Sequence, residues 1–123
     1  MRVVFVCVEN SNRSQMAEAF ARLAGLDASS AGSRPSGIVN PKAIESMREL
    51  GYDLSAHQSK SIDDLQGDFD LAITMGCGDQ CPNLRAKRRE DWQIPDPKHL
   101  PPDEFRKIRD LIGEKVKALA ETG

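Results

Sequence analysis

Short apolar runs that alternate with amphipathic helical segments are the feature that most constrains this fold. Residues 3–6 are short, continuous, β-branched and aromatic, which is typical of a buried strand. We expect strands at residues 3–6, 28–31, 69–75 and 90–93, and helices at residues 14–23, 41–50 and 103–121. Because strands and helices alternate, the sequence predicts an α/β domain with a small parallel sheet and helices on both faces.

Length and charge limit the class of protein. The 123 residues suit a single domain, 1–123, with no repeat or interdomain linker. The net charge of −2 argues against a nucleic-acid partner, and no apolar run is long enough to cross a membrane. The N-terminus has no signal-peptide pattern, so the cytoplasm is the expected location. Three cysteines there indicate catalysis, redox chemistry or metal binding rather than a disulfide framework.

The segment between the first strand and the first helix carries the strongest chemical pattern. Cys7 ends the strand, and Arg13 and Ser14 open the helix, in the spacing Cys-x5-Arg-Ser. The backbone N–H groups of such a loop and the helix N-terminus attract an anion, and the guanidinium of Arg13 suits a tetrahedral oxyanion. The same field favours a thiolate at Cys7, to which Ser14 can donate a hydrogen bond. Asn10 tolerates the left-handed backbone that a tight cradle without glycine needs.

A packed structural thiol is the simpler interpretation of a lone cysteine after a strand. Here the complete pattern, with a strand before it and a helix after it, favours a nucleophile inside an anion cradle. Ligands of α/β sheets bind beyond the carboxyl ends of the strands, where this loop is expected.

The segment FVCVENSNRSQMAEAF resembles the active-site loop of the low-molecular-weight tyrosine phosphatase superfamily, and in particular the thioredoxin-coupled arsenate reductases of that fold. The similarity continues in order through SAGSRPSGIVNPKAIESMRELGYDLSAHQSKSIDDL, FDLAITMGCGDQCP and KRREDWQIPDP to the terminal helix. It implies a flavodoxin-like fold with a four-stranded parallel sheet, and an enzyme with Cys7 as nucleophile and Asp96 as general acid. The oxyanion-binding residues that it implies are Val8, Glu9, Asn10, Ser11, Asn12 and Arg13.

The two other cysteines separate the branches of this superfamily. A phosphatase needs one cysteine, whereas reducing arsenate takes two electrons, which a dithiol supplies by forming a disulfide. The resemblance implies that Cys7 attacks arsenic, that Cys77 attacks Cys7 and releases arsenite, and that Cys81 then attacks Cys77. Thioredoxin or a similar external thiol would reduce the final disulfide, so no bound cofactor is expected. Two departures from familiar relatives are the four-residue spacing of Cys77 and Cys81 and the presence of Asn12 where another cysteine is common.

Two other functions stay open from the sequence. A low-molecular-weight phosphatase would hydrolyse phosphomonoesters through a Cys7 phosphoenzyme, and a redox or metal-responsive module would bind without turnover. The shortage of aromatic residues favours a small inorganic oxyanion, as does Lys98, which follows the Asp-Pro pair where tyrosine phosphatases often have tyrosine. A zinc site would need more ligands than two spare cysteines and two unpaired histidines provide.

Some members of the superfamily hold a potassium ion beside the loop. Asn10, Glu18 and Ser30 match three of its ligands, but Lys60 stands where an Asp is expected. The ammonium of Lys60 would neutralise Glu18 in place of the ion, and a solvated Lys60 is an equally good interpretation. We therefore expect no required metal.

The remaining motifs have structural interpretations. The basic run at residues 85–89 indicates a solvated loop. Trp92 and Phe105 are expected in the core. The last helix is expected to bury one face, which contains Phe105, Ile108, Leu111, Ile112, Lys115 and Leu119.

Overall fold

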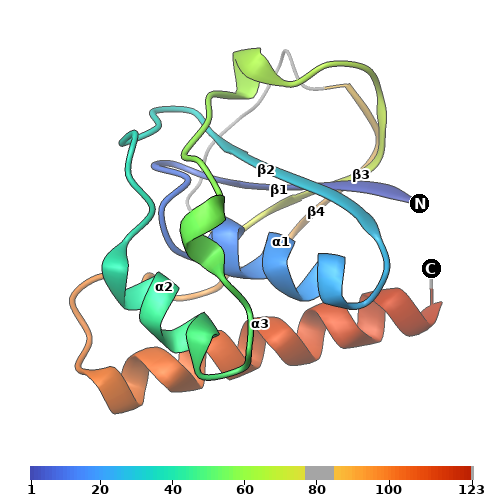
Figure 1. Cartoon of the computed structure of the whole chain (residues 1–123). Helices are drawn as coiled ribbons and strands as arrows, with labels where there is room; N and C mark the ends of the chain where they lie inside the picture. Colours follow the sequence, from blue (N-terminus) through green and yellow to red (C-terminus); the bar gives the residue numbers. More distant parts are fainter. Residues whose placement is uncertain (77–84, 123) are drawn as a thin grey trace.

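Four parallel strands form the centre of the protein (Figure 1). The computed structural model describes residues 1–76 and 85–122. The strands are β1 (Arg2–Cys7), β2 (Asp27–Gly32), β3 (Phe69–Thr74) and β4 (Ala86–Asp91), in the spatial order β2-β1-β3-β4. Each pair of neighbours is parallel, and the register of β1 with β2 places Cys7 opposite Gly32.

Three α-helices cover one face of this sheet. They are α1 (Arg13–Leu23), α2 (Pro41–Arg48) and α3 (Pro102–Thr122). The core that they share with the sheet includes Val3, Phe5, Met16, Met47, Leu71, Phe105 and Ile112. Figure 1 shows α1 lying between the sheet and α3. Within the described residues, none of these helices has an apolar stretch of the length that a membrane crossing requires.

A 3-10 helix and the residue after it lie on the opposite face. Ile62 of η2 (Ile62–Asp64) and Leu65 pack against the cluster of Val4 and Val6. Figure 1 shows η2 on the other side of the sheet from the three α-helices. The predicted fold class, a small parallel four-stranded α/β sheet with helices on both faces, is confirmed, with only a 3-10 helix on the second face of the described chain.

The second helix begins as its sequence predicts. Asn40 is the N-cap residue, and its side chain accepts a hydrogen bond from the backbone N–H of Lys42 at 2.9 Å. Pro41 occupies the first turn, where no intrahelical N–H is needed. The helix ends at Arg48, and Gly51 adopts a φ of 84° in the turn that follows.

The position of the fourth strand corrects the prediction. The sequence predicted a strand at residues 90–93 and a solvated loop at residues 85–89, whereas β4 spans Ala86–Asp91 and takes in most of the basic run. The loop prediction is wrong because backbone hydrogen bonds hold an edge strand, so that its side chains need not be apolar. Lys87 Nζ lies 3.5 Å from Asp70 Oδ1 on the neighbouring strand.

The buried face of α3 differs from the predicted face at three positions, one of which is Val116, buried although it was not predicted. Phe105 and Ile112 are buried as predicted, but Arg109 is only 7% exposed and Leu111 is 40% exposed. Phe105, Arg109 and Ile112 follow helical spacing, whereas Leu111 is displaced from Ile112 by about 100° around the axis. The assignment of Leu111 to the buried face is therefore wrong.

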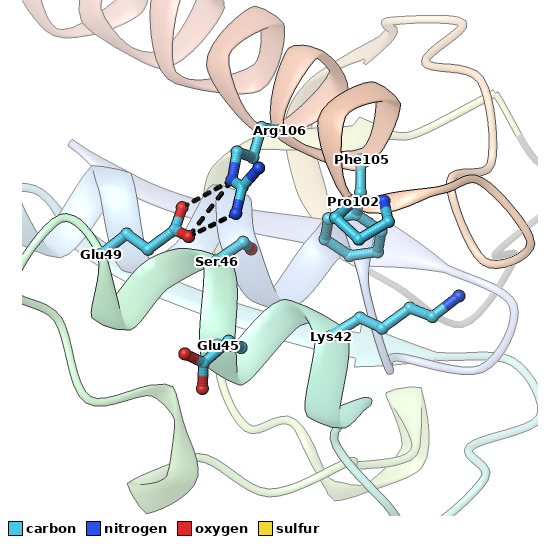
Figure 2. A pocket seen from close by; sticks show the side chains of 7 residues that line it. All are labelled: Lys42, Glu45, Ser46, Glu49, Pro102, Phe105 and Arg106. Atoms are coloured by element: carbon cyan, nitrogen blue, oxygen red, sulfur yellow. Dashed lines mark hydrogen bonds and ion pairs between the residues drawn. The ribbon is translucent and has the colours of Figure 1, made fainter.

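Ionic contacts explain the buried arginine and join the end of α2 to α3, and Figure 2 shows one of them, between Arg106 and Glu49. Arg109 Nη1 donates to Ser46 O at 2.9 Å and to Glu49 Oε1 at 2.8 Å. Arg106 Nη2 donates to Glu49 Oε2 at 2.9 Å, and this guanidinium holds the pKa of Glu49 below its ordinary value. A cavity of about 120 Å³ lies beside these contacts, with Phe105 in its wall.

The carboxyl ends of the two central strands, β1 and β3, lie side by side at the same end of the sheet. The chain passes from β1 to its neighbour on one side, β2, and later returns to β3 on the other side. The crevice at such a switch point is where open α/β sheets bind ligands. The loop after β1 occupies this position.

Candidate active site

The loop between β1 and α1 is tightly curled and held from outside. Asn10 has a left-handed backbone with a φ of 51°, as expected for a tight cradle without glycine. Arg34 N donates to Val8 O at 2.8 Å, and Asn40 N donates to Ser11 O at 3.1 Å. These backbone contacts tie the loop to the segment that connects β2 to α2.

A cavity of about 140 Å³ adjoins this loop. It is lined by Cys7, Val8, Glu9, Ser11, Asn12, Arg13, Asp96 and Lys98. Its floor is buried, since Cys7 is 4% exposed and Arg13 is 9% exposed. Its rim is formed by the more exposed side chains of Glu9, Asp96 and Lys98. Because a water molecule takes about 30 Å³ in the liquid, the space suits a tetrahedral oxyanion with a few waters.

Two backbone carbonyls hold the guanidinium of Arg13. Nη1 donates to Met75 O at 2.8 Å and to Ile94 O at 2.9 Å. Met75 follows β3, and Ile94 precedes the loop that carries Asp96, so Arg13 connects three segments around the cavity. A guanidinium fixed in this position favours a bound oxyanion.

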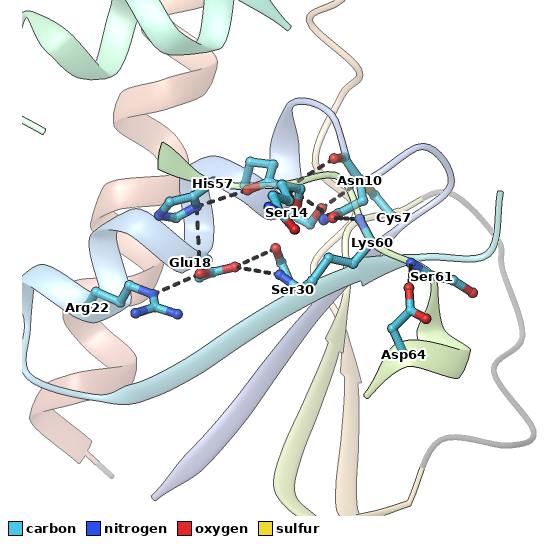
Figure 3. Close-up of polar contacts among 12 residues, drawn as sticks. Cys7, Asn10, Ser14, Glu18, Arg22, Ser30, His57, Lys60, Ser61 and Asp64 are labelled. Atoms are coloured by element: carbon cyan, nitrogen blue, oxygen red, sulfur yellow. Dashed lines mark hydrogen bonds and ion pairs between the residues drawn. The ribbon is translucent and has the colours of Figure 1, made fainter. Parts of the chain in front are cut away.

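A chain of hydrogen bonds extends from the sulfur of Cys7 (Figure 3). Cys7 Sγ lies 2.9 Å from Ser14 Oγ, and Asn10 Nδ2 donates to the same oxygen at 2.8 Å. Gln15 Nε2 donates in turn to Asn10 Oδ1 at 2.9 Å. Because Ser14 Oγ accepts from Asn10, its own hydrogen is available to the sulfur.

His57 and Tyr52 continue this chain. His57 Nδ1 lies 2.9 Å from Gln15 Oε1, and His57 Nε2 lies 2.6 Å from the hydroxyl of Tyr52. Gln15 Oε1 can only accept, so Nδ1 carries the hydrogen and Nε2 of the neutral ring accepts from Tyr52. Burial lowers the pKa of His57, although the negative charge of Glu18 acts in the opposite direction. The lowered pKa favours the neutral ring. Every donor in the chain therefore points toward Cys7.

Glu18 of α1 is a buried carboxylate beside this chain. Its Oε1 accepts from Ser30 Oγ at 2.6 Å and lies 3.8 Å from Lys60 Nζ. Its Oε2 accepts from Arg22 Nε at 2.8 Å, and Figure 3 shows Lys60 and Arg22 approaching the two oxygens. Lys60 thus places a positive charge beside Glu18, in line with one of the two interpretations that the sequence left open. That no metal is required stays a prediction.

Asp96 and Lys98 reach the cavity from the loop before α3. Asp96 Oδ1 accepts from the backbone N–H of Lys98 at 3.0 Å, which fixes the carboxylate against its own loop. Both residues line the cavity together with Cys7. The predicted acid, Asp96, and the predicted nucleophile, Cys7, therefore face the same cavity. Lys98 also forms an ion pair with Glu9, which lies 89 positions earlier in the sequence.

The structure brings many of the predicted site residues together. Those that line the cavity are Cys7, Val8, Glu9, Ser11, Asn12, Arg13 and Asp96. Asn10 and Ser14 belong to the hydrogen-bond chain instead. The predicted relay residues Cys77 and Cys81 lie outside the described residues, so their part in the site stays a prediction.

Sequence reasoning missed the supports of this site. Gln15 comes directly after the Arg-Ser pair and is fully buried. A buried side-chain amide needs hydrogen-bond partners, so this position was the signal that could have pointed to the hydrogen-bond chain. Tyr52 gives no such signal in the sequence. It contacts His57, which in turn contacts Gln15 of α1, so the connection from Tyr52 to the site depends on the fold. Lys98 and Glu9 are joined only by folding.

Comparisons with known proteins agree with this geometry. A family model described as low molecular weight phosphotyrosine protein phosphatase matches residues 2–122. The chain is 40% identical to arsenate reductase 1 of Staphylococcus haemolyticus, over 98% of this chain and 95% of that protein. It is 39% identical to the glutaredoxin arsenate reductase of Synechocystis sp., over 96% and 95% of the two chains. A solved arsenate reductase in the phosphate binding state, 38% identical, superimposes with a TM-score of 0.90 over 98% and 97% of the two chains.

Proposed function

The chain belongs to the low molecular weight phosphotyrosine protein phosphatase family, and within this family we propose that it is an arsenate reductase. One observation carries the proposal: Cys7 and Arg13 lie together on the buried floor of a cavity of oxyanion size. The 40% identity to an arsenate reductase over nearly the whole chain supports arsenate as the oxyanion.

The reaction begins at Cys7. Its thiolate attacks the arsenic of bound arsenate, while Arg13 and the N–H groups of the loop hold the remaining oxygens. Asp96 gives a proton to the departing oxygen, which leaves as water as the sulfur–arsenic bond forms. The hydrogen bond from Ser14 stabilises the thiolate before the attack.

A second thiol completes the reduction. Cys77 attacks the sulfur of Cys7, the sulfur–arsenic bond breaks, and its electron pair stays on arsenic, which leaves as arsenite. Two electrons have then passed to arsenic, and Cys7 and Cys77 are joined by a disulfide. In support, Cys77 follows Gly76 in the chain, two residues after Met75, whose carbonyl oxygen holds Arg13 at 2.8 Å.

Cys81 and an external dithiol regenerate the enzyme. Cys81 attacks Cys77, which releases the Cys7 thiolate, and the donor reduces the Cys77–Cys81 disulfide by thiol exchange. Thioredoxin is the proposed donor, and the name of the Synechocystis relative makes a glutaredoxin the alternative to test. A relay that must be reduced in every cycle suits the cytoplasm, where thiols are kept reduced.

Arsenate-dependent oxidation of NADPH, measured with thioredoxin and its reductase, tests this function. The wild-type protein should turn over, and Cys7→Ser should abolish the rate because the loop then lacks the thiol that attacks arsenic. A variant that still consumed NADPH on addition of arsenate would show that the loop is not the reaction site.

The cysteine relay makes a sharper prediction. Cys77→Ser should eliminate multiple-turnover arsenate reduction, since the hydroxyl of serine cannot attack the sulfur of Cys7 to release arsenite. Cys81→Ser should allow a single turnover and accumulate a Cys7–Cys77 disulfide, to be detected by mass spectrometry of peptides after exposure to arsenate. If both variants cycled arsenate at the wild-type rate with thioredoxin as sole donor, the internal relay would be wrong.

Hydrolysis of phosphomonoesters is the second candidate function. It is favoured by the family itself and by the cavity, which would accept phosphate as readily as arsenate. Hydrolysis needs Cys7, Arg13 and Asp96 but no electrons. Cys77→Ser should therefore spare the hydrolysis of a small aryl phosphate while removing arsenate reduction, which separates the two activities in one protein.

A further inference from the structure

An ion pair crosses the rim of the active-site cavity. Lys98 Nζ lies 3.3 Å from both carboxylate oxygens of Glu9, and each side chain is 43% exposed. Glu9 belongs to the loop after β1 and Lys98 to the loop before α3, so the pair joins the two loops that enclose the cavity. Both residues line that cavity together with Cys7 and Arg13.

A carboxylate in an anion-binding loop opposes the loop's function. Glu9 would repel an entering oxyanion, and Lys98 neutralises it. An exposed ion pair contributes little stability, so a dianion competes well for the ammonium. Among the described residues that line the cavity, Lys98 and Arg13 are the two cationic side chains, and Arg13 is already fixed by two carbonyls. Lys98 is thus the cation that can change partner.

The position of the pair also distinguishes inorganic oxyanions from esters. When sulfur attacks from the floor, the departing group of the substrate lies opposite the sulfur, toward Asp96 and the rim. In an inorganic oxyanion that group is a small oxygen, which leaves room for the Lys98 ammonium. In a phosphomonoester it carries an organic substituent, which must displace the ion pair and offers it no compensating charge.

We propose that Glu9 and Lys98 form a selective rim that favours inorganic tetrahedral oxyanions over their organic esters. This inference rests on the proposed function and names the substrate class of the same site. Lys98 exchanges Glu9 for the bound oxyanion, and Glu9 holds the ammonium at the rim while the site is empty. Lys98 is a specificity-determining residue, and it takes no part in bond making.

Calorimetric binding of two anions tests the rim without turnover. The probes are inorganic phosphate and phenylphosphonate, whose carbon–phosphorus bond cannot be hydrolysed. Wild-type protein should prefer phosphate. Lys98→Met should weaken phosphate about tenfold and phenylphosphonate about twofold, so the preference falls about fivefold, as expected for loss of one charge-assisted hydrogen bond. Glu9→Gln should instead tighten phosphate about threefold, because the competitor for Lys98 loses its charge.

A matched control separates the rim from net charge. Lys107 forms a similar exposed ion pair with Glu104 on α3, at 3.2 Å, and Lys107 does not line the cavity. Lys107→Met should leave the preference within about twofold of the wild type, and Lys98→Arg should restore most of it. Thermal unfolding of each variant should be close to that of the wild type, because these side chains are exposed.

The outcomes distinguish this inference from the proposed function. If Lys98→Met weakened the binding of phosphate and of phenylphosphonate equally, the selective rim would be overturned. The proposal that the protein reduces arsenate would be unaffected. Looser phosphate binding by Glu9→Gln would overturn the exchange of partners. A protein that prefers phosphate as described but reduces no arsenate would overturn the proposed function and support the rim.

Discussion

At the scale of single residues, the direction of the hydrogen bonds around Cys7 matters most. The hydroxyl oxygen of Ser14 accepts a hydrogen bond from Asn10, so its own hydrogen is available to the sulfur of Cys7. Gln15 orients Asn10, and His57 orients Gln15. Bonds that run in one direction polarise one another, so the remote members help to stabilise a negative sulfur. The neutral form of His57 maintains this order.

The pH dependence of stability should report on His57. Burial holds its folded-state pKa below the ordinary value of 6.5, so the unfolded chain takes up this proton more readily. Stability from this residue is complete above that ordinary value and is lost as pH falls toward the folded pKa. Urea unfolding at about pH 7.5 and about pH 5.5 should therefore show a smaller difference for His57→Gln than for the wild type.

The second histidine supplies the control for this experiment. His99 is exposed on the loop before α3. His99→Gln should leave the difference between the two pH values unchanged. A wild-type difference that survived in His57→Gln would mean that other groups carry the pH dependence.

At the scale of elements, the end of β2 is built around the loop after β1. Gly32 lies opposite Cys7 in the sheet. A Cβ atom at this position would clash with Val8 O and lie 2.9 Å from Cys7 O, which are backbone atoms. The strand therefore requires glycine here because the loop curls directly over it.

Gly32→Ala should damage both stability and anion binding. The added methyl group must push the loop away from β2, which should lower the free energy of unfolding by about 1–3 kcal/mol. Phosphate affinity should fall with it, because the displaced N–H groups no longer converge. Gly25→Ala is the matched control, since its φ is 83° but nothing lies within 4 Å. It should cost about 1 kcal/mol and leave phosphate binding unchanged.

At the scale of the whole molecule, α3 closes the core that supports the site. Ile112 is fully buried among residues from the sheet and the other helices, whereas the adjacent Leu111 is 40% exposed. Buried and exposed positions follow each other directly because successive residues differ by about 100° around a helix.

The two neighbouring positions offer a paired test of the core. Ile112→Ala should lower the free energy of unfolding by about 2–5 kcal/mol, from lost burial and the cavity left behind. Leu111→Ala should change it by no more than about 0.5 kcal/mol. Denaturant unfolding measures both. Similar losses in the two variants would contradict the orientation of α3.

The sequence by itself determined the local elements and the chemistry of the first loop. Apolar periodicity located β1, α1, α2 and β3 to within a residue or two, because each buries a face of its own. The spacing from Cys7 to Arg13 predicted an anion cradle, since a strand, a loop and a helix N-terminus are contiguous in the chain. These features depend on near neighbours, which a sequence displays directly.

Tertiary structure alone decided which distant side chains serve the cradle. The strand β4 was misplaced because an edge strand is defined by its hydrogen-bonded neighbour and not by apolar side chains. The approach of Lys98 to Glu9, and of His57 to Gln15, follows from the order of the strands and the paths of the loops. Such contacts carry no periodicity, because a charged or polar side chain looks the same in the sequence whether it faces solvent or a partner.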